Sequence, residues 1–503
     1  NGKEETLYTS VPSGPLPAGG YIEIWGKQND GKPDNALYKN PANQLNDAYS
    51  FETDSASYFL TVNPAGGNKR FVNAINDVAG NSLPPDPYFM YHFRIDFKDQ
   101  INRGKAVNYG EYVYSSTYDV GELWTTGDIH PGGPANQQTG SLHVAATGPL
   151  ATLSVCFTGN SFLGSGRNVK ADINDVNFIN APLAPFEAKI ISNNAIPLTA
   201  INAPSVKFTL SNVNTNVNDR VAASFIDLLY PHVFDFDGKA NFLFTLAPNA
   251  QGNYLEIKNF AWSGPAPVLY EFTSQKRYVA NTSVNGLLRF ALPPSASARD
   301  FVLVNQDVTN VFNVNSLTQR NFINFTSSSN QGDYLIISNK ILYANNAVEN
   351  YRQYRASTAG GSYNAKIYDI DELTDQFAFG IKKHPISIHN FLRYARKNFA
   401  VAPKMVFLIG KAVTYDQARI NENSPYIDQL NLVPTFGWPA SDNILASDNL
   451  DPLPATHIGR LSAVNTLEIN NYLDKVKLYE QQQASTVQTI ANKAWMKTMV
   501  HVV

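Results

Sequence analysis

The feature that most constrains this 503-residue sequence is a change of hydrophobic pattern near residue 330. Before that point, short aromatic and β-branched runs alternate with turn clusters such as Asn29-Asp30-Gly31. Runs of this kind, often with period-two alternation, predict antiparallel sandwiches or jelly rolls. The predicted strands are at 21–25, 58–62, 89–97, 142–146, 153–157, 206–210 and 242–246.

Beyond residue 330, continuous apolar runs alternate with helical patterns. Strands buried on both faces are predicted at 334–337, 365–370 and 405–409, with a further strand at 495–503. Helices are predicted at 345–355, 385–399 and 465–483, and another from Asp371 as N-cap. Strands alternating with helices predict a mostly parallel α/β sheet, whose active site would lie beyond the carboxyl ends of the strands.

The length suits two to four domains. The Gly- and Pro-rich stretch 127–140 marks the preferred boundary within the β region. We therefore expect a multidomain chain: an N-terminal β domain at 1–126, a β-sandwich region at 127–330 and an α/β domain at 331–503. The last run of the sequence is strand-like, so the chain is expected to be a piece of a longer protein with a truncated α/β domain.

Composition narrows the class of protein. Only 16% of residues are charged, against about 25% in typical soluble domains, and the balance is typical of exported β-rich proteins. The net charge of −3 argues against nucleic-acid binding. A single cysteine, Cys156, excludes an intrachain disulfide framework and a multi-thiolate zinc site. No run of 18 apolar residues predicts a membrane-spanning helix.

A search for catalytic motifs is largely negative. The sequence has no phosphate-binding Gly-x-x-x-x-Gly-Lys-Ser/Thr loop, no His-Glu-x-x-His and no Gly-x-Ser-x-Gly. Cys156 lies in an alternating strand pattern, which favours a buried thiol over a nucleophile. His384 and His389 are interpreted as solvated or capping residues, and His457 and His501 as core residues.

An acidic loop is the best candidate for a metal site. Asp442, Asp448 and Asp451 lie close together in an Asn-, Pro- and Ser-rich stretch, and their oxygens could hold calcium. The alternative, slightly favoured, is that these residues stabilise Asx turns.

The last third of the chain resembles the gingipain family of cysteine peptidases. Ile458-Gly459-Arg460-Leu461, followed on the next helix by Tyr479-Glu480, is the most specific part. In the same order stand Asp333-Tyr-Leu-Ile-Ile-Ser338, Lys404-Met-Val-Phe-Leu-Ile-Gly410, Val433-Pro-Thr435 and Ser441-Asp442-Asn443.

The β region is similar to the amino-terminal part of PorU-like sortases of the type IX secretion system of Bacteroidota. The similarity is carried by Tyr21-Ile-Glu-Ile-Trp-Gly26, Asp54-Ser-Ala-Ser-Tyr58 and Val268-Leu-Tyr270. The resemblance implies a caspase-like α/β fold with a Cys–His pair, in which the histidine lowers the thiol pKa and the thiolate attacks a peptide carbonyl.

For PorU-like members the resemblance further implies substrates, partners and location. Such a protein removes the carboxy-terminal sorting domain of exported cargo and joins the cargo to surface lipopolysaccharide. It works beside a PorV-like outer-membrane β-barrel, at the cell surface.

The sequence departs from the family pattern at the catalytic residues. In the family these follow the strand that matches 496–503, and this chain has no cysteine after Cys156. The catalytic Cys and His are therefore expected beyond Val503, with none in this chain. Two alternatives stay open: a secreted gingipain-like protease, and a non-catalytic surface scaffold.

Overall fold

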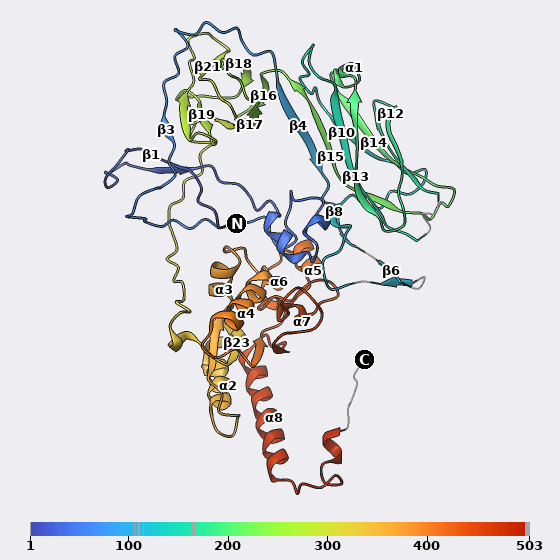
Figure 1. Cartoon of the computed structure of the whole chain (residues 1–503), viewed down its shortest axis with the longest axis vertical. Helices are drawn as coiled ribbons and strands as arrows, with labels where there is room; N and C mark the ends of the chain where they lie inside the picture. Colours follow the sequence, from blue (N-terminus) through green and yellow to red (C-terminus); the bar gives the residue numbers. More distant parts are fainter. Residues whose placement is uncertain (1, 105, 109–110, 114, 163–165, 498–503) are drawn as a thin grey trace.

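The structure is a computed structural model that describes residues 2–104, 106–108, 111–113, 115–162 and 166–497. Its β-rich parts lie at one end of the long axis and its α/β part at the other (Figure 1). The predicted fold class is confirmed, because β-sheet units precede a parallel α/β sheet.

A β-sandwich is built from two four-stranded antiparallel sheets, in the orders β13-β10-β15-β4 and β12-β11-β14-β9. Alternate residues of its strands, such as Val169, Ala171 and Ile173 of β11, point into one buried core. The elements are β4 (Phe89–Asp96), β9 (Ala135–Thr139), β10 (Ala151–Gly159), β11 (Asn168–Ile173), β12 (Val176–Pro182), β13 (Ala188–Ile196), α1 (Leu198–Ile201), β14 (Val206–Val213) and β15 (Val221–His232).

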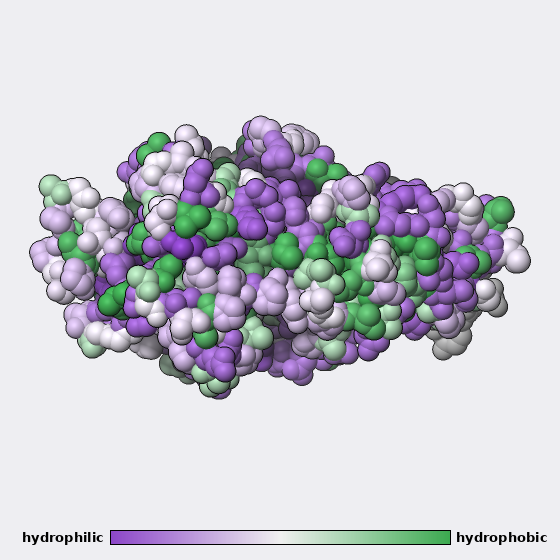
Figure 2. All heavy atoms as spheres, turned by 90° about the horizontal axis from the view of Figure 1, so that it is seen from above, coloured by the Kyte–Doolittle hydropathy of each residue, from purple (hydrophilic) through white to green (hydrophobic). Residues whose placement is uncertain are grey.

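A second β unit follows, with sheets in the orders β16-β18-β21 and β17-β22-β19-β20-β3. Phenylalanines dominate its core, and the rings of Phe236 and Phe242 stack with centroids 3.9 Å apart. The strands are β3 (Val72–Asn73), β16 (Asp235–Lys239), β17 (Asn241–Leu246), β18 (Asn253–Phe260), β19 (Val268–Glu271), β20 (Lys276–Val279), β21 (Leu288–Leu292) and β22 (Arg299–Val304). Seen from above this end, hydrophobic residues lie in small groups among hydrophilic ones (Figure 2).

The α/β part has a parallel sheet in the order β24-β23-β25-β26. Central β23 is buried on both faces: Tyr334 and Ile336 pack on the side of α2 and α8, and Leu335 and Ile337 on the side of α3 and α4. The strands are β23 (Tyr334–Ser338), β24 (Ala365–Asp369), β25 (Met405–Ile409) and β26 (His457–Leu461). The helices are η3 (Ser328–Asn330), η4 (Lys340–Asn346), α2 (Ala347–Ala356), α3 (Ile370–Phe377), α4 (Ile386–Asn398), α5 (Tyr415–Ile420), α6 (Pro425–Leu430), α7 (Asp442–Leu445), α8 (Thr466–Ser485) and η5 (Ala494–Lys497).

The N-terminal segment links the β units to the α/β part. It contains β1 (Leu7–Thr9), β2 (Ile22–Ile24), η1 (Lys32–Leu37), η2 (Pro41–Asn43), β5 (Gln100–Arg103), β6 (Ala106–Asn108), β7 (Glu111–Val113) and β8 (Glu122–Thr125). Its buried residues Leu37, Phe51 and Trp124 belong to the same core as Leu335 of β23. This segment therefore packs directly on the α/β part.

The sheets do not follow the division expected at 126/127. Strand β4 pairs with β15 over eight residues, from Phe225↔Asp96 to His232↔Phe89, and β3 pairs with β20. Both ladders join residues far apart in sequence. The turn-rich stretch at 127–140 gives no indication of these pairings.

Two strand predictions are wrong, and a third is wrong at its first three residues. Residues 58–62 are extended and exposed but have no ladder, and 142–146 forms only the isolated bridge Val144↔His232. Residues 495–497 lie in the 3₁₀ helix η5, and 498–503, including His501, lie outside the described residues. Residues 58–62 have no neighbouring strand among the described residues, and 142–146 pairs with the end of β15 at one bridge only; pairing, not propensity, makes a strand.

Candidate functional site

The carboxyl edge of the parallel sheet is the place where an α/β fold of this kind holds its ligands. Ser338, Asp369, Ile409 and Leu461 end the four strands side by side, as the parallel register requires. Ser338 is fully buried, and its hydroxyl donates to the carbonyl of Ile409, 2.8 Å away. The Ser338 side chain thus joins the ends of β23 and β25 at this edge.

Asp369 is a buried carboxyl at this edge. Its Oδ1 accepts from the backbone N–H groups of Asp371 and Glu372, at 3.0 and 3.1 Å, so Asp369 and not the predicted Asp371 caps α3. Its Oδ2 is buried and has no hydrogen-bond partner among the described residues. Burial, assisted by the charge of Asp371, raises the pKa of Asp369 above its usual range.

Two neighbours complete this cluster. Lys340 Nζ lies 3.1 Å from Glu372 Oε1 and 3.7 Å from Asp369 Oδ1, so it partly neutralises both carboxylates. The buried hydroxyl of Tyr343 has no partner within the described part of the chain, and burial raises its pKa. The cluster contains no thiol and no histidine, the pair that a cysteine peptidase needs.

Arg460 fixes the loop that borders the edge. Its Nε and Nη2 form a two-pronged contact with Asp442 Oδ2 and Oδ1, both at 2.7 Å. Its remaining N–H groups donate to the carbonyls of Gly410, Val433 and Pro434, each at 2.8 Å. The guanidinium therefore holds together segments that follow β25 and precede β26, as its planar fork suits it to do.

The three candidate calcium ligands each contact a different cation. Asp442 binds Arg460, Asp448 binds Arg396 with Oδ1 2.6 Å from Nη2, and Asp451 binds Lys39. Within the described ranges no group of three or more His, Cys, Asp or Glu is arranged to hold a metal. Calcium at these residues stays a prediction.

Cys156 lies far from this edge, in β10 of the sandwich. It is fully buried against Leu123 and Phe225, and burial raises its pKa to about 12. A thiolate nucleophile needs a lowered pKa and access to substrate, so Cys156 is the core thiol that the sequence indicated. His143 contacts Asp235 and Asp237, not Cys156.

The interpretation of the other histidines is wrong in part. His384 is fully buried with Nε2 3.2 Å from Asp34 Oδ1, although its Nδ1 does cap the start of α4 by accepting from the N–H of Ile386. His389 is 2% exposed, and burial lowers its pKa to about 4. His457 is exposed at the amino end of β26, opposite the candidate site. No local signal pairs His384 with Asp34, which is 350 residues away.

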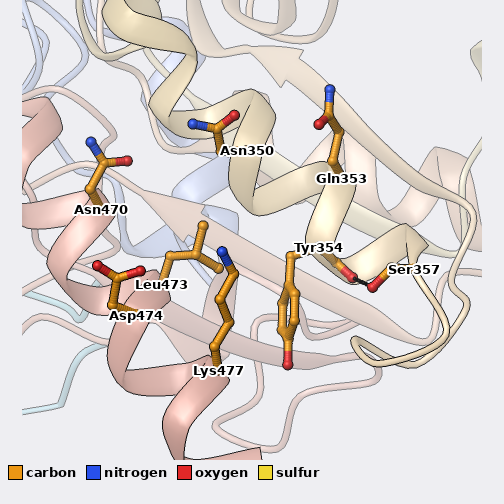
Figure 3. A pocket seen from close by; sticks show the side chains of 8 residues that line it. All are labelled: Asn350, Gln353, Tyr354, Ser357, Asn470, Leu473, Asp474 and Lys477. Atoms are coloured by element: carbon orange, nitrogen blue, oxygen red, sulfur yellow. Dashed lines mark hydrogen bonds between the residues drawn. The ribbon is translucent and has the colours of Figure 1, made fainter.

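A surface hollow of about 480 Å³ lies between α2 and α8 on the outer face of the sheet (Figure 3). It lies beside the contact in which Glu480 of α8 accepts from Arg355 and Tyr354, at 2.8 and 2.7 Å. A smaller hollow of about 260 Å³ adjoins His389 and Asp448. The first is lined by Asn350, Gln353, Tyr354, Ser357, Asn470, Leu473, Asp474 and Lys477, without a pair suited to nucleophilic catalysis.

No helix among the described residues is long and apolar enough to cross a membrane.

Comparison with known proteins shows which family the α/β part resembles. Residues 327–503 match the model of peptidase family C25. A search of curated proteins found no match.

Among solved structures, dimeric latent PorU from Porphyromonas gingivalis matches with a TM-score of 0.55 and 13% identity, over 87% of this chain and 41% of that chain. A family two carbohydrate esterase from Cellvibrio japonicus matches with a TM-score of 0.16 and 10% identity, over 78% and 98% of the two chains. The Endo-D glycoside hydrolase domain from Streptococcus pneumoniae gives 0.15 and 12%, over 42% and 37%. Scores this low support no conclusion.

The chain thus spans less than half of the PorU chain that it matches, and 13% identity speaks for the fold alone. The matched residues, 327–503, include the strands of the carboxyl edge and the Arg460 fork. Residues 327–503 are thus similar to peptidase family C25, and 87% of the chain shares its fold with part of latent PorU.

Proposed function

We propose that this chain is part of a sortase-like cysteine endopeptidase and transpeptidase of the type IX secretion pathway. The observation that carries the proposal is the family C25 match over 327–503, joined to a fold shared with latent PorU over 87% of the chain. In this proposal the enzyme removes sorting domains from exported cargo and attaches the cargo to the cell surface.

The chemistry proposed is acyl transfer through a thiol. A histidine takes the thiol proton, the thiolate attacks the scissile carbonyl, and an acyl-enzyme forms as the sorting domain leaves. An amine-bearing acceptor on lipopolysaccharide then attacks the acyl-enzyme and regenerates the thiol. Cys156 is unsuited to this role because its pKa of about 12 keeps it protonated in the core. We place the reactive Cys and His in sequence that follows Val503.

The proposed partners are those of a surface enzyme. Substrates are exported proteins with carboxy-terminal sorting domains, and a PorV-like outer-membrane barrel holds the enzyme at the surface. The low charge fraction of 16% and the β units preceding the α/β part are in keeping with an exported protein of this kind.

The test is made on the native protein, by intact mass, peptide mapping and iodoacetamide labelling. The proposal expects a mass above 55.5 kDa and a labelled cysteine other than Cys156, whose replacement stops cargo processing. A native protein without such a cysteine would refute the peptidase proposal.

One observation favours a second candidate, a non-catalytic surface scaffold. Cys156 has no histidine partner among the described residues, and it packs in an apolar cluster with Leu123, Phe225 and Leu45. A scaffold predicts cargo or glycan binding without cleavage. A gingipain-like secreted protease predicts instead that acyl-enzyme is released by water, with no acceptor joined to the product.

A further inference from the structure

The carboxyl edge of the parallel sheet is covered by a part of the chain that we call the cap, residues 29–54, 100–104 and 115–125. The cap packs on α5 and on the loop 432–438, which both follow β25. Ring centroids of Tyr118 lie 5.2 Å from Tyr415 and 5.5 Å from Phe436. A Cβ on Gly437, which has φ of 67°, would lie 1.7 Å from the carbonyl oxygen of Ser116. The fit leaves no room for a side chain there.

Charged contacts join the cap to the α/β part. Arg103 Nη2 lies 2.5 Å from Asp416 Oδ2, and His384 Nε2 lies 3.2 Å from Asp34 Oδ1. Arg419 contacts Asp54 and also Glu422, while Lys98 approaches Asp54 at 2.5 Å. Arg103, Arg419 and Lys98 are thus each engaged by carboxylates other than Glu122 and Glu52.

Glu122 of the cap forms no ion pair among the described residues. It is 1% exposed, its Oε1 accepts from the Tyr415 hydroxyl, and its Oε2 accepts from the N–H of Asp119 at 2.9 Å. Arg103 is its partner in the β5–β8 ladder but extends to Asp416 instead. Apart from Arg103, the titratable groups found close to Glu122 are carboxyls and phenols: Asp119, Asp416, Tyr38, Tyr118 and Tyr415.

Glu52 repeats the arrangement nearby. It accepts from the Tyr118 hydroxyl at 3.4 Å and faces Asp34, while Arg419 near it is held by Asp54 and Glu422. Glu122 is thus buried and Glu52 partly buried, and neither forms an ion pair within the described residues. A buried charge without a partner is costly, and a carboxyl in that position retains its proton.

We propose that the cap is a proton-operated latch over the carboxyl edge of the sheet, closed when Glu122 and Glu52 carry protons and loosened when they ionise. The inference concerns access to the edge and does not depend on the proposed peptidase function. Protonated Glu122 can also donate a hydrogen bond, which its charged form cannot.

The direction of the pH dependence follows from the burial. Burial, with Asp119 and Asp416 close by, raises the pKa of Glu122 well above its usual range, and burial with Asp34 does the same for Glu52. A raised pKa in the closed state means that closure is fully favoured below the ordinary carboxyl pKa of about 4.3. The equilibrium constant for closure falls as pH rises towards the raised pKa, by up to about tenfold per pH unit for each group that titrates.

Hydrogen exchange followed by mass spectrometry tests the latch between pH 5 and 8. Protection factors are compared for peptides covering 31–38, 50–54, 116–124 and 415–420, each corrected for the intrinsic pH dependence of exchange. Peptides of β10 and β15 serve as internal references. In the unaltered chain, protection of the latch peptides is expected to fall with pH relative to the references. The Gln side chain in Glu122→Gln cannot ionise. In this variant the fall of protection with pH should therefore be less steep, by up to about tenfold per pH unit.

The matched control is Glu271→Gln, since Glu271 is also 1% exposed but lies in β19 opposite Arg299, 3.9 Å away. This control should leave the latch slope unchanged. An identical slope in Glu122→Gln and the unaltered chain, or a flat profile in the unaltered chain, would overturn the inference. Should Glu122→Gln not fold, the partly exposed Glu52→Gln carries the same test.

Discussion

Arg167 and Asp219 form an ion pair in the β-sandwich, and both side chains are fully buried. Asp219 accepts from Arg167 Nε at 2.7 Å, from Ser161 Oγ at 2.5 Å and from Asn214 Nδ2 at 3.0 Å. Burial alone would raise the pKa of Asp219, but the hydrogen bonds and charge of Arg167, with Ser161, outweigh it and hold the pKa well below its usual range.

Replacement of Asp219 by asparagine keeps the shape and removes the charge. Arg167 would then be a buried cation without a counter-ion, a situation that destabilises proteins by about 3–5 kcal/mol. Each 1.4 kcal/mol is a factor of about ten, so the opening equilibrium of the sandwich should rise by roughly two to four orders of magnitude. Because the pKa of Asp219 is depressed, its stabilisation is complete above a pH of about 4 and is lost as pH falls further.

The assay is native-state hydrogen exchange of the amides of β11 and β14 in low urea, which reports opening of the sandwich separately from the other units. Asp172→Asn in β11 is the control, because Asp172 is partly exposed and its side chain accepts a hydrogen bond from Asn177 at 2.6 Å. Its effect should stay within about 0.5 kcal/mol. The double variant Arg167→Met with Asp219→Leu, which removes both charges, should recover part of the loss. A loss below about 1 kcal/mol for Asp219→Asn, or no recovery in the double variant, would refute the reasoning.

Three further predictions follow from other parts of the chain. Cys156 should resist iodoacetamide at pH 8 in the folded protein and react fully in guanidinium, since it is fully buried with a pKa of about 12; labelling of the native thiol would contradict this. Arg460→Lys keeps the charge but loses the fork to Asp442, so hydrogen exchange over 441–446 should become at least about tenfold faster; an unchanged rate would show that the loop does not depend on the fork. Ile336→Ala should destabilise the α/β part by about 2–5 kcal/mol in urea unfolding followed at the α2 amides, whereas exposed Leu467→Ala should change it by less than about 0.5 kcal/mol; equal effects would argue against a buried β23.

Local sequence information was sufficient for several elements of the α/β part, but it did not predict β26 and it predicted a strand where η5 lies. The strands at 334–338 and 405–409 and the helix at 466–485 agree with prediction within two residues, because each carries a hydrophobic period that only one kind of element can bury. The N-cap of α3 was misplaced by two residues, from Asp369 to Asp371, since several acidic residues there could serve as a cap.

The candidate site was only partly accessible from the sequence. Asp442 stood out as an acidic loop residue, yet the chain itself supplies its cation, Arg460, from the following strand. Likewise Asp448 and Asp451 contact Arg396 and Lys39, from α4 and from the N-terminal segment. Sequence spacing shows which acids are close to one another, but not which cations the fold brings to them.

The sequence by itself determined the β-rich character before residue 330, the alternation of strands and helices beyond it, the buried character of Cys156 and the resemblance to a peptidase family, because these depend on short-range pattern. Only the tertiary structure decided that β4 joins the sandwich across the expected boundary and that residues 29–54 and 115–125 cover the carboxyl edge of the sheet. The physical reason is that pairs such as Asp34 with His384 and Glu122 with Tyr415 form across 350 and 293 residues. Contacts at that separation leave no periodic trace in the chain and exist only once it is folded.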